Sequence, residues 1–348
     1  MSQQVSTIYD IMRSTGKYGG DRLRGEVGVE IETETEKAYD YPKMKFWNTT
    51  KDNSLRDFGV EYILKQPMDI PDFEKALSEF DLAEKKYKFR KGSISTSVHV
   101  HLNFLNDTYL TMANFVTAYA LVENLLIRYS GPDRLSNLFC LPMCDAEGVK
   151  DHIVTLLSYV NRNMFAKVSV PAEKCKYGGL NPSPLSTLGT LEVRTFRGET
   201  DTKIILRWIE ILMKLKTFAR RTNLTPVDIM HMWKDHRAGI LDLIFHEYAA
   251  ELRWKDPKTK KDVTDDLIRQ NLKFAADFAC VSKDWTKFGL LKIKPVYKEK
   301  CKEALDEIAQ RKFKGPFDSL QYQERVAVME SYHNLYPNQK IVDADGDI

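Results

Sequence analysis

The sequence predicts an α+β fold, in which strands and helices are mixed up to about residue 222 and helices alone follow. Three segments predict strands because apolar and polar residues alternate in each of them: 27–34, 95–104 and 190–197. Side chains two residues apart share one face of a strand. Each segment therefore presents an apolar face to a core and a face rich in carboxylate, imidazole or guanidinium groups.

The polar faces of these strands differ from an ordinary solvated strand face, which is rich in Thr, Lys and Ser. They hold Glu30, Glu32 and Glu34 in the first segment, Ser97, His99, His101 and Asn103 in the second, and Glu192 and Arg194 in the third. Taken alone, Glu-x-Glu is more often a solvated face and Glu-x-Arg an ion pair within one strand. Together, on three strands of one kind, the motifs favour a shared site for divalent cations and phosphate.

Turn and capping signals define the other elements. Asp72 is placed to cap a helix after Pro71, and Gly131 follows a run of apolar residues at helical spacing. In chain order, the predicted elements are a short helix within 1–24, strands over 26–34 and 58–64, a helix over 73–87, the His-x-His strand, a helix over 108–128, a helix near 149–162, the Glu-x-Arg strand and a helix over 201–221.

The chain changes character after residue 222. Residues 226–252, 264–281 and 296–312 read as helices with Lys-rich connections. We therefore predict two domains, a catalytic domain over 1–222 and a helical C-terminal region over 223–348. The second could be a lid, an oligomer contact or a partner-docking module. Strands separated by helices and hairpin-like loops suit a sheet with helices on one face.

Composition limits the classes of function. Of 348 residues 43% are hydrophobic, which supports a sizeable core, and the net charge of +3 permits phosphorylated ligands without demanding nucleic acid. Five dispersed cysteines without a Cys-x-x-Cys pair predict reduced thiols. We find neither an apolar signal core near the first residues nor eighteen consecutive apolar residues, so we expect a cytoplasmic protein without a membrane partner. An oligomer is left open.

The charges on the polar face need compensation. Carboxylates buried together repel one another, and a divalent cation removes that cost. Oxygen ligands with one imidazole suit Mg²⁺ or Mn²⁺ better than Zn²⁺, and the number of carboxylates could hold two or more ions. Mg²⁺ in such sites also contacts substrate phosphates, and Arg194 on the same face could donate to a transferring phosphoryl group.

Four motifs, in order, resemble those of the amidoligase family. Gly28–Glu32 is similar to its first-strand motif, and Asp52-Asn53-Ser54-Leu55 with Gly59-Val60-Glu61 is similar to its Asp-Gly-Ser-Leu … Gly-x-Glu motif. Ser97–His101 is similar to its Gly-x-His-x-His strand. Lys176–Asn181 with Gly189–Arg194 is similar to its Lys-Tyr-x-x-Leu-Asn … Gly-Thr-x-Glu-x-Arg motif. The resemblance covers about residues 24–215. Asn53 and Thr96 stand where the family usually has Gly. Asn tolerates a positive φ, whereas Thr96 leaves the conformation of its loop open.

The family belongs to the carboxylate–amine ligase superfamily of glutamine synthetase and γ-glutamylcysteine synthetase. The resemblance therefore implies a glutamine-synthetase-like antiparallel sheet and ATP-dependent formation of an amide or isopeptide-like bond through an acyl phosphate. ATP and two or more Mg²⁺ ions are the implied cofactors. Implied substrates are a small-molecule carboxylate and an amine. A peptide, a polyamine and a modified nucleobase remain open.

The resemblance also implies roles for individual residues. Glu30, His99 and Glu192 resemble ligands of the metal that bridges the ATP phosphates, and Glu32 and Glu61 resemble ligands of a second metal. Arg194, Lys176 and Glu61 are the catalytic candidates, and Arg194, Lys176, Asn181 and Arg134 are the candidates for binding ATP. For Arg134 a surface ion pair is the alternative. His101 shares the strand face with His99 and is expected to contact the metal ligands rather than the metal.

Two other functions remain open at this stage. Relatives in the superfamily phosphorylate guanidino groups, so the same site could belong to a small-molecule kinase on a guanidino or carboxylate substrate. The sheet could also be a catalytically retired scaffold, with the helical region serving assembly. The competent residues at all the principal polar positions argue against that second alternative.

Overall fold

The computed structural model describes residues 7–14, 22–38, 40, 42–52, 55, 58–135, 137–138, 140–146, 151, 175, 177–221, 224–283, 285 and 299–335. The chain divides into two compact units, Met1–Leu290 and Leu291–Ile348. The sheet and the helices as far as residue 279 lie in the first unit. The predicted division at residue 222 into a catalytic and a helical domain stays a prediction.

Among the described residues, six strands form one antiparallel sheet, which confirms the α+β prediction. In sheet order they are β2 (Trp47–Lys51), β3 (Phe58–Leu64), β1 (Val27–Thr35), β4 (Ser97–Asn103), β6 (Thr190–Arg197) and β5 (Leu180–Asn181). No strand was predicted over the residues of β2. Its alternation is weak because it is an edge strand whose one large apolar residue, Trp47, is buried under the sheet.

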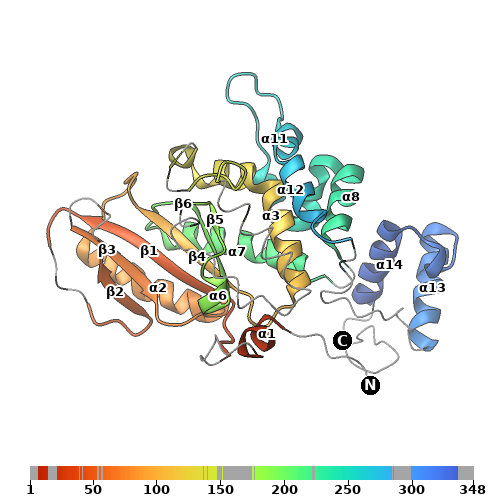
Figure 1. Cartoon of the computed structure of the whole chain (residues 1–348), viewed down its shortest axis with the longest axis horizontal. Coiled ribbons are helices and arrows are strands. Elements are labelled where there is room, and N and C mark those ends of the chain that lie inside the picture. The colour runs from red at the N-terminus through yellow and green to blue at the C-terminus, as the bar shows by residue number, and fades with distance from the viewer. Residues whose placement is uncertain are drawn as a thin grey trace. The chain divides into compact units, whose positions relative to one another are not determined.

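Helices pack on the apolar face of this sheet, and Figure 1 shows one of them, α2 (Ile70–Tyr87), lying along the strands β1, β2 and β3. Trp47 and Tyr62 pack on Phe80 of α2 (Ile70–Tyr87), with ring centroids 5.8 and 5.1 Å away. Phe196 of β6 stacks on Trp208 of α7 (Thr202–Ala219) at 4.8 Å. Each stacked or edge-on aromatic pair adds about 1 kcal/mol to the burial of its apolar area.

The start of α2 corrects one prediction. The helix begins at Ile70 after Asp69, and Pro71 lies in its first turn rather than before it. Proline is tolerated there because the first N–H groups of a helix have no intrahelical partner. Asp72 is therefore not the cap; it forms an exposed ion pair with Lys75.

The central helix is α3 (Tyr109–Ser130), whose N-cap Thr108 accepts a hydrogen bond from the Thr111 N–H. It contacts α7, α8, α11 and α12, so it joins the sheet layer to the later helices. α3 has the length and apolar composition of a membrane span, but 94% of its most apolar window is buried inside the protein. That burial is typical of a core helix.

The later helices are shorter than the sequence predicted. The predicted helix over 226–252 is interrupted twice, at Arg237 (φ 53°) and His246 (φ 50°). Residues other than glycine rarely adopt a positive φ, and a right-handed helix cannot continue through it. The other helices that the structure describes in the first unit are α1 (Ile8–Ser14), α6 (Leu185–Leu188), α8 (Pro226–His236), α9 (Ile240–Phe245), α10 (Ala249–Leu252), α11 (Thr264–Gln270) and α12 (Leu272–Ala279), with 3₁₀ turns at Pro132–Arg134, Arg237–Gly239 and His246–Tyr248. The predicted helix near 149–162 lies outside the described residues except Asp151.

The second unit contains α13 (Glu299–Phe313), the 3₁₀ turn Phe317–Ser319 and α14 (Tyr322–Leu335). These elements share a small core of their own, in which Leu305, Phe317 and Val328 are buried. The prediction of a helix over 296–312 agrees with α13, whereas α14 was not predicted.

A buried ion cluster connects α7 to one end of the sheet. The Lys216 ammonium is fully buried and pairs with Glu26, lies 3.4 Å from Asp107, and donates to the Asn103 carbonyl. Arg220 pairs with the same two carboxylates, at 2.9 Å from Glu26 and 2.5 Å from Asp107. We call these four residues, Glu26, Asp107, Lys216 and Arg220, the closed ion cluster.

Candidate metal and phosphate site

The register of the sheet brings the predicted polar residues together. Glu30 of β1 lies opposite His99 of β4, and Glu32 of β1 lies opposite Glu61 of β3. His101 lies opposite Glu192 of β6. Side chains paired across antiparallel strands on one face are neighbours, so the residues of four strands form one patch.

His99 lies at the centre of this patch. Its Nδ1 is 3.2 Å from Glu30 Oε2 and 3.5 Å from Glu192 Oε1, and its Nε2 is 3.9 Å from Glu32 Oε1. The sequence analysis grouped Glu30, His99 and Glu192, and the structure brings these three side chains into contact. The imidazole is 4% exposed, so the contacts are largely shielded from water.

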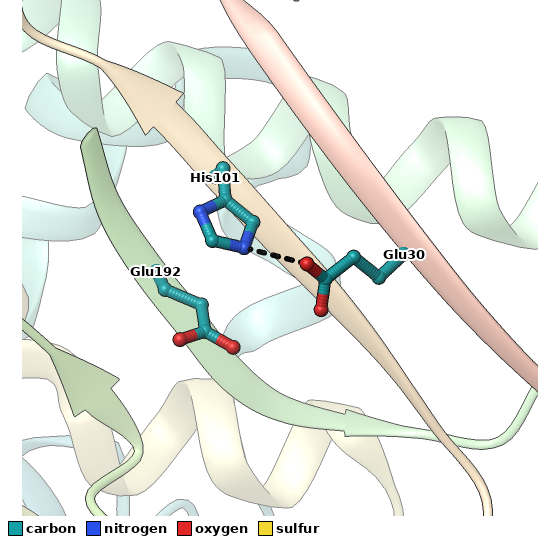
Figure 2. A group of neighbouring side chains, drawn as sticks. All are labelled: Glu30, His101 and Glu192. Atoms are coloured by element: carbon teal, nitrogen blue, oxygen red, sulfur yellow. Dashed lines mark ion pairs between the residues drawn. The ribbon is translucent and has the colours of Figure 1, made fainter. Parts of the chain in front are cut away.

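His101 lies closer to the carboxylates than predicted. Its Nε2 is 3.3 Å from Glu30 Oε1, and Figure 2 shows the ring between Glu30 and Glu192. Burial disfavours the charged imidazolium, but the hydrogen bond to Glu30 and the charges of Glu192 and Glu30 outweigh it and raise the pKa of His101. Glu30, His101 and Glu192 each offer one ligand atom within 4.8 Å of the others. His101 is therefore a candidate ligand itself, beside its predicted supporting role.

A second acidic group lies toward the edge of the sheet. Glu32, Asp52 and Glu61 also offer ligand atoms within 4.8 Å of one another. Burial, together with the charges of Glu30, Glu32 and Asp52, raises the pKa of Glu61 to about 8. The sequence analysis read Asp52 as part of a motif but gave it no role. Asp52 directly follows β2, and because this strand was not predicted, the position of Asp52 beside Glu32 and Glu61 could not be inferred.

Serine hydroxyls on β4 and in the turn before it bind the carboxylates of β1. Ser97 Oγ donates to Glu32 Oε2 at 2.6 Å and lies 2.7 Å from His99 Nε2. Ser93 and Ser95 both donate to Glu34, each at 2.7 Å. The sequence analysis assigned no function to these serines, although every second residue from 93 to 101 is Ser or His.

A β-bulge in β6 sets the direction of Arg194. Val98 pairs with Phe196 and Val100 with Val193, so Arg194 and Thr195 together lie opposite His99. A bulge of this kind bends the strand and re-aims a side chain. Arg194 thereby meets Glu192 in an ion pair, and Phe196 returns to the apolar face. The loss of alternation between Val193 and Phe196 was a sequence signal for this bulge.

Arg134 supports the bulge from within the protein. It is 5% exposed, and its guanidinium donates to the carbonyls of Thr195 at 3.1 Å and Arg194 at 2.9 Å. A buried guanidinium that binds two carbonyls differs from the surface ion pair considered as its alternative. Binding of ATP by Arg134 stays a prediction.

The other ATP-binding candidates lie on or near β5. Asn181 Nδ2 donates to Glu192 Oε2 at 2.6 Å, which orients that carboxylate. Lys176 lies outside the described residues, so its predicted role is not placed. Gly179, two residues before Asn181, donates to the Leu141 carbonyl at 2.7 Å and fixes the approach to β5.

The donor set fits Mg²⁺ or Mn²⁺ better than Zn²⁺. Five carboxylates (Glu30, Glu32, Asp52, Glu61 and Glu192) and two imidazoles, of His99 and His101, converge on the patch. Among the described arginines, Arg194 pairs with Glu192, and the charge of Arg134 acts on Glu32. Hard oxygen donors with few nitrogens suit these ions, and none of the ligand groups found among the described residues contains a cysteine. The excess of negative charge makes the patch suited to holding cations.

The comparison with protein families agrees with the motif analysis. Residues 67–216 match the family model described as "Putative amidoligase enzyme". The match covers β4, β5 and β6, including His99, Asn181, Glu192 and Arg194, whereas Glu30, Glu32 and Glu61 precede it. No curated protein matches the chain.

Proposed function

We propose that this chain, which belongs to the amidoligase family over residues 67–216, is an ATP-dependent carboxylate–amine ligase. The family match supports an enzyme of the ligase class. The observation that carries the finer proposal is the meeting of Glu30, His99 and Glu192 from three strands on one polar sheet face. An excess of carboxylates beside an arginine is suited to Mg²⁺ and phosphate, which ATP chemistry requires.

The proposed reaction has two steps. A carboxylate oxygen of the first substrate attacks the γ-phosphorus of ATP, the bond to the β-phosphate oxygen breaks, and an acyl phosphate and ADP form. The amine nitrogen of the second substrate then attacks the acyl carbon, the carbon–oxygen bond to phosphate breaks, and the nitrogen loses a proton. The products are an amide, ADP and inorganic phosphate.

In this proposal Glu30, His99 and Glu192 hold one Mg²⁺, and Glu32 and Glu61, joined by Asp52, hold a second. Bound Mg²⁺ would neutralise the phosphate oxygens and align them for transfer. Asn181 keeps Glu192 in place through its hydrogen bond.

Arg194 would donate to the transferred phosphoryl group, because a guanidinium matches the geometry of phosphate oxygens. The bulge that aims it is held by Arg134. Lys176 is proposed to neutralise phosphate or the acyl phosphate. Charge neutralisation and positioning would supply most of the rate.

Glutamate or another amino acid, a peptide terminus, a polyamine and a modified nucleobase remain candidates for the carboxylate and amine. A cytoplasmic location and an oligomeric state likewise stay predictions.

Release of ADP and phosphate with ATP and Mg²⁺, against pooled amino acids, amines and polyamines, tests the proposal. The product is identified by mass spectrometry, with Glu30→Gln as the inactive variant and the exposed Glu74→Gln as the matched control. Release that requires both a carboxylate and an amine, with loss of water in the joined product, supports the ligase. A stable phosphorylated product would contradict the ligase and favour the small-molecule kinase. Absence of Mg²⁺-dependent ATP binding would favour the catalytically retired scaffold.

A further inference from the structure

Gly179 lies where the segment leading into β5 passes the bulge of β6. A Cβ atom at this position would lie 2.7 Å from Thr195 Cγ2, which is closer than real Cβ atoms approach other heavy atoms. It would also lie 3.2 Å from Glu123 Oε1 and 3.4 Å from the Leu141 carbonyl oxygen. Thr195 is fully buried, and in a close-packed interior its methyl group can move only if its neighbours move too. A side chain at position 179 would therefore push the two strands apart.

The bulge accounts for the position of the Thr195 methyl group. Arg194 and Thr195 together lie opposite His99, so β6 carries one residue more than its partner over this stretch. A bulge displaces side chains from the regular alternation of a strand. The methyl group of Thr195 occupies the space that a side chain at position 179 would need. The missing side chain of Gly179 thus compensates for the bulge that aims Arg194.

Gly179 is also bound on both sides through its backbone. The Arg194 N–H donates to the Gly179 carbonyl at 2.8 Å, and the Gly179 N–H donates to the Leu141 carbonyl at 2.7 Å. The pairing with β6 continues beyond Gly179, with Asn181 opposite Glu192. A displacement at Gly179 would therefore move β5 relative to β6 at Glu192.

The two groups that hold Glu192 both depend on this spacing. Asn181 Nδ2 donates to Glu192 Oε2 at 2.6 Å, and Asn181 Oδ1 accepts from the Ser183 N–H at 3.0 Å. The second contact fixes which end of the amide faces Glu192. The other oxygen, Glu192 Oε1, pairs with Arg194. Each carboxylate oxygen of Glu192 thus meets a side chain from one of the two strands that Gly179 joins.

We propose that Gly179 is a positioning residue, whose missing side chain sets the spacing of β5 and β6 at which Asn181 and Arg194 both bind Glu192. The effect on catalysis rests on the proposed function, in which Glu192 holds Mg²⁺ and Arg194 donates to the transferred phosphoryl group. The spacing itself does not rest on that function. Replacing groups that orient metal ligands typically costs about 10- to 100-fold in metal affinity or activity.

The contact allows a test that moves one methyl group from one strand to the other. Gly179→Ala adds a methyl group, and Thr195→Ser removes Cγ2 while keeping the hydroxyl. In the double variant, which has the same total of atoms at the two positions as the wild type, the closest remaining contact is 3.2 Å, to Glu123 Oε1. Gly239→Ala is the matched control, because the nearest side-chain atom to its added methyl group, His236 Cβ, lies 3.7 Å away.

The first test is hydrogen exchange of the Arg194 amide, which needs no activity. The exchange of a hydrogen-bonded N–H reports how often its surroundings open, and NMR of protein labelled with ¹⁵N-arginine measures it. We expect Gly179→Ala to speed this exchange at least about tenfold, and the double variant and Gly239→Ala to keep the wild-type rate. Unchanged exchange in Gly179→Ala, or no recovery in the double variant, would overturn the proposal.

The same pair of variants decides the case in which Gly179→Ala does not fold. Folding of Gly179→Ala/Thr195→Ser would then support the proposal, because only the position of one methyl group differs from the wild type. A double variant that also fails to fold would overturn it.

The second test is turnover, measured as ADP release with the pooled carboxylates and amines. We expect Gly179→Ala to lower kcat about 10- to 100-fold with little change in KM for ATP, because the groups it displaces act on the transferred phosphoryl group. The double variant should recover the wild-type kcat. Full kcat in Gly179→Ala would refute the role of Gly179 in the reaction. No ADP release by the wild type, with the expected exchange rates present, would instead reject the proposed function.

Discussion

The closed ion cluster and the candidate site use similar residues with opposite electrostatic results. In the cluster two carboxylates, Glu26 and Asp107, meet two cations, Lys216 and Arg220. Burial opposes ionisation of Glu26, but the hydrogen bond of Arg220 and the charge of Lys216 outweigh it and lower its pKa. In the candidate site the pKa of Glu61 rises instead, to about 8.

The difference shows that burial alone does not mark a functional carboxylate. The closed ion cluster is balanced, so it needs no ligand and can serve only the fold. The candidate site has more carboxylates than described cations around them, so a bound cation would complete it. Neutralising one acid should therefore have different effects in the two places.

The largest expected effect compares the same substitution in both regions. Glu192→Gln should lower ATP turnover by at least about 10³-fold, or about 4 kcal/mol, because it removes a proposed metal ligand while leaving the volume of the side chain nearly unchanged. Glu26→Gln in the closed ion cluster should lose stability and keep its turnover per folded molecule. ADP release and circular dichroism on both variants measure this, and near-full turnover by Glu192→Gln would show that the site is misplaced.

The next effect reverses the comparison by removing a cation. Lys216→Met leaves Glu26 and Asp107 with Arg220 alone and should lower the free energy of unfolding by about 3 kcal/mol. Urea unfolding measures the loss, and Lys214→Met, at a partly exposed lysine paired with Glu247 at 2.9 Å, is the matched control. Equal midpoints for the two variants would mean that the cluster does not stabilise the fold.

A third effect is the binding of a divalent cation to the candidate site. Mn²⁺ or Mg²⁺ at about 100 times its Kd should stabilise the wild-type protein by about 2.7 kcal/mol, which raises Tm by several degrees. Glu30→Gln should lose this shift and Glu26→Gln should keep it. Thermal scans with and without EDTA test the expectation, and an equal shift in Glu30→Gln would assign the ion to another place.

The last prediction concerns a buried carboxylate that lies outside both regions and is affected by the charge of Asp145. Glu123 of α3 is fully buried and accepts from the Met143 N–H at 2.8 Å, and burial raises its pKa to about 8. Its protonated form is favoured on folding, so its contribution to stability is complete below about pH 4.5 and is lost as pH rises through about 8.

Glu123→Gln should remove this dependence, because Gln keeps the acceptor oxygen and has no proton to lose. The difference in unfolding free energy between variant and wild type should grow in favour of Gln by up to about 1.4 kcal/mol per pH unit between pH 5 and 8. Urea titrations at several pH values measure it. A difference that is constant with pH would show that Glu123 is ionised throughout that range.

Much of the fold followed from alternation and spacing. The three alternating segments are strands, and their polar residues share one face, because the period of a strand is fixed by its backbone. The partners across the strands could not be read from one sequence, since the register depends on turns and on the whole sheet. Ser97 and Asp52 were therefore given no role, and Arg134 was not recognised as the support of the bulge.

The helical region shows a different limit. Helical spacing predicted one helix over 226–252, but Arg237 and His246 adopt positive φ angles. Neither residue is a glycine, so the residue types at these two positions did not indicate a break in the helix. Lys216 was predicted only as part of the helix over 201–221. Its burial depends on Glu26, which is 190 residues away in the sequence.

The alternation of β1 also has a consequence for how the chain finds its register. A slip of β1 by one residue would turn Glu30 and Glu32 into the aromatic layer and bring Val29 and Ile31 out to face the histidines. Such a mispaired sheet would bury several unpaired charges, which costs free energy. The mispaired form would therefore be less stable than the native pairing and would be sparsely populated during folding. The carboxylates proposed to serve the reaction would thus also disfavour incorrect strand pairing. Replacing several of them with apolar residues should produce a chain that misfolds more often.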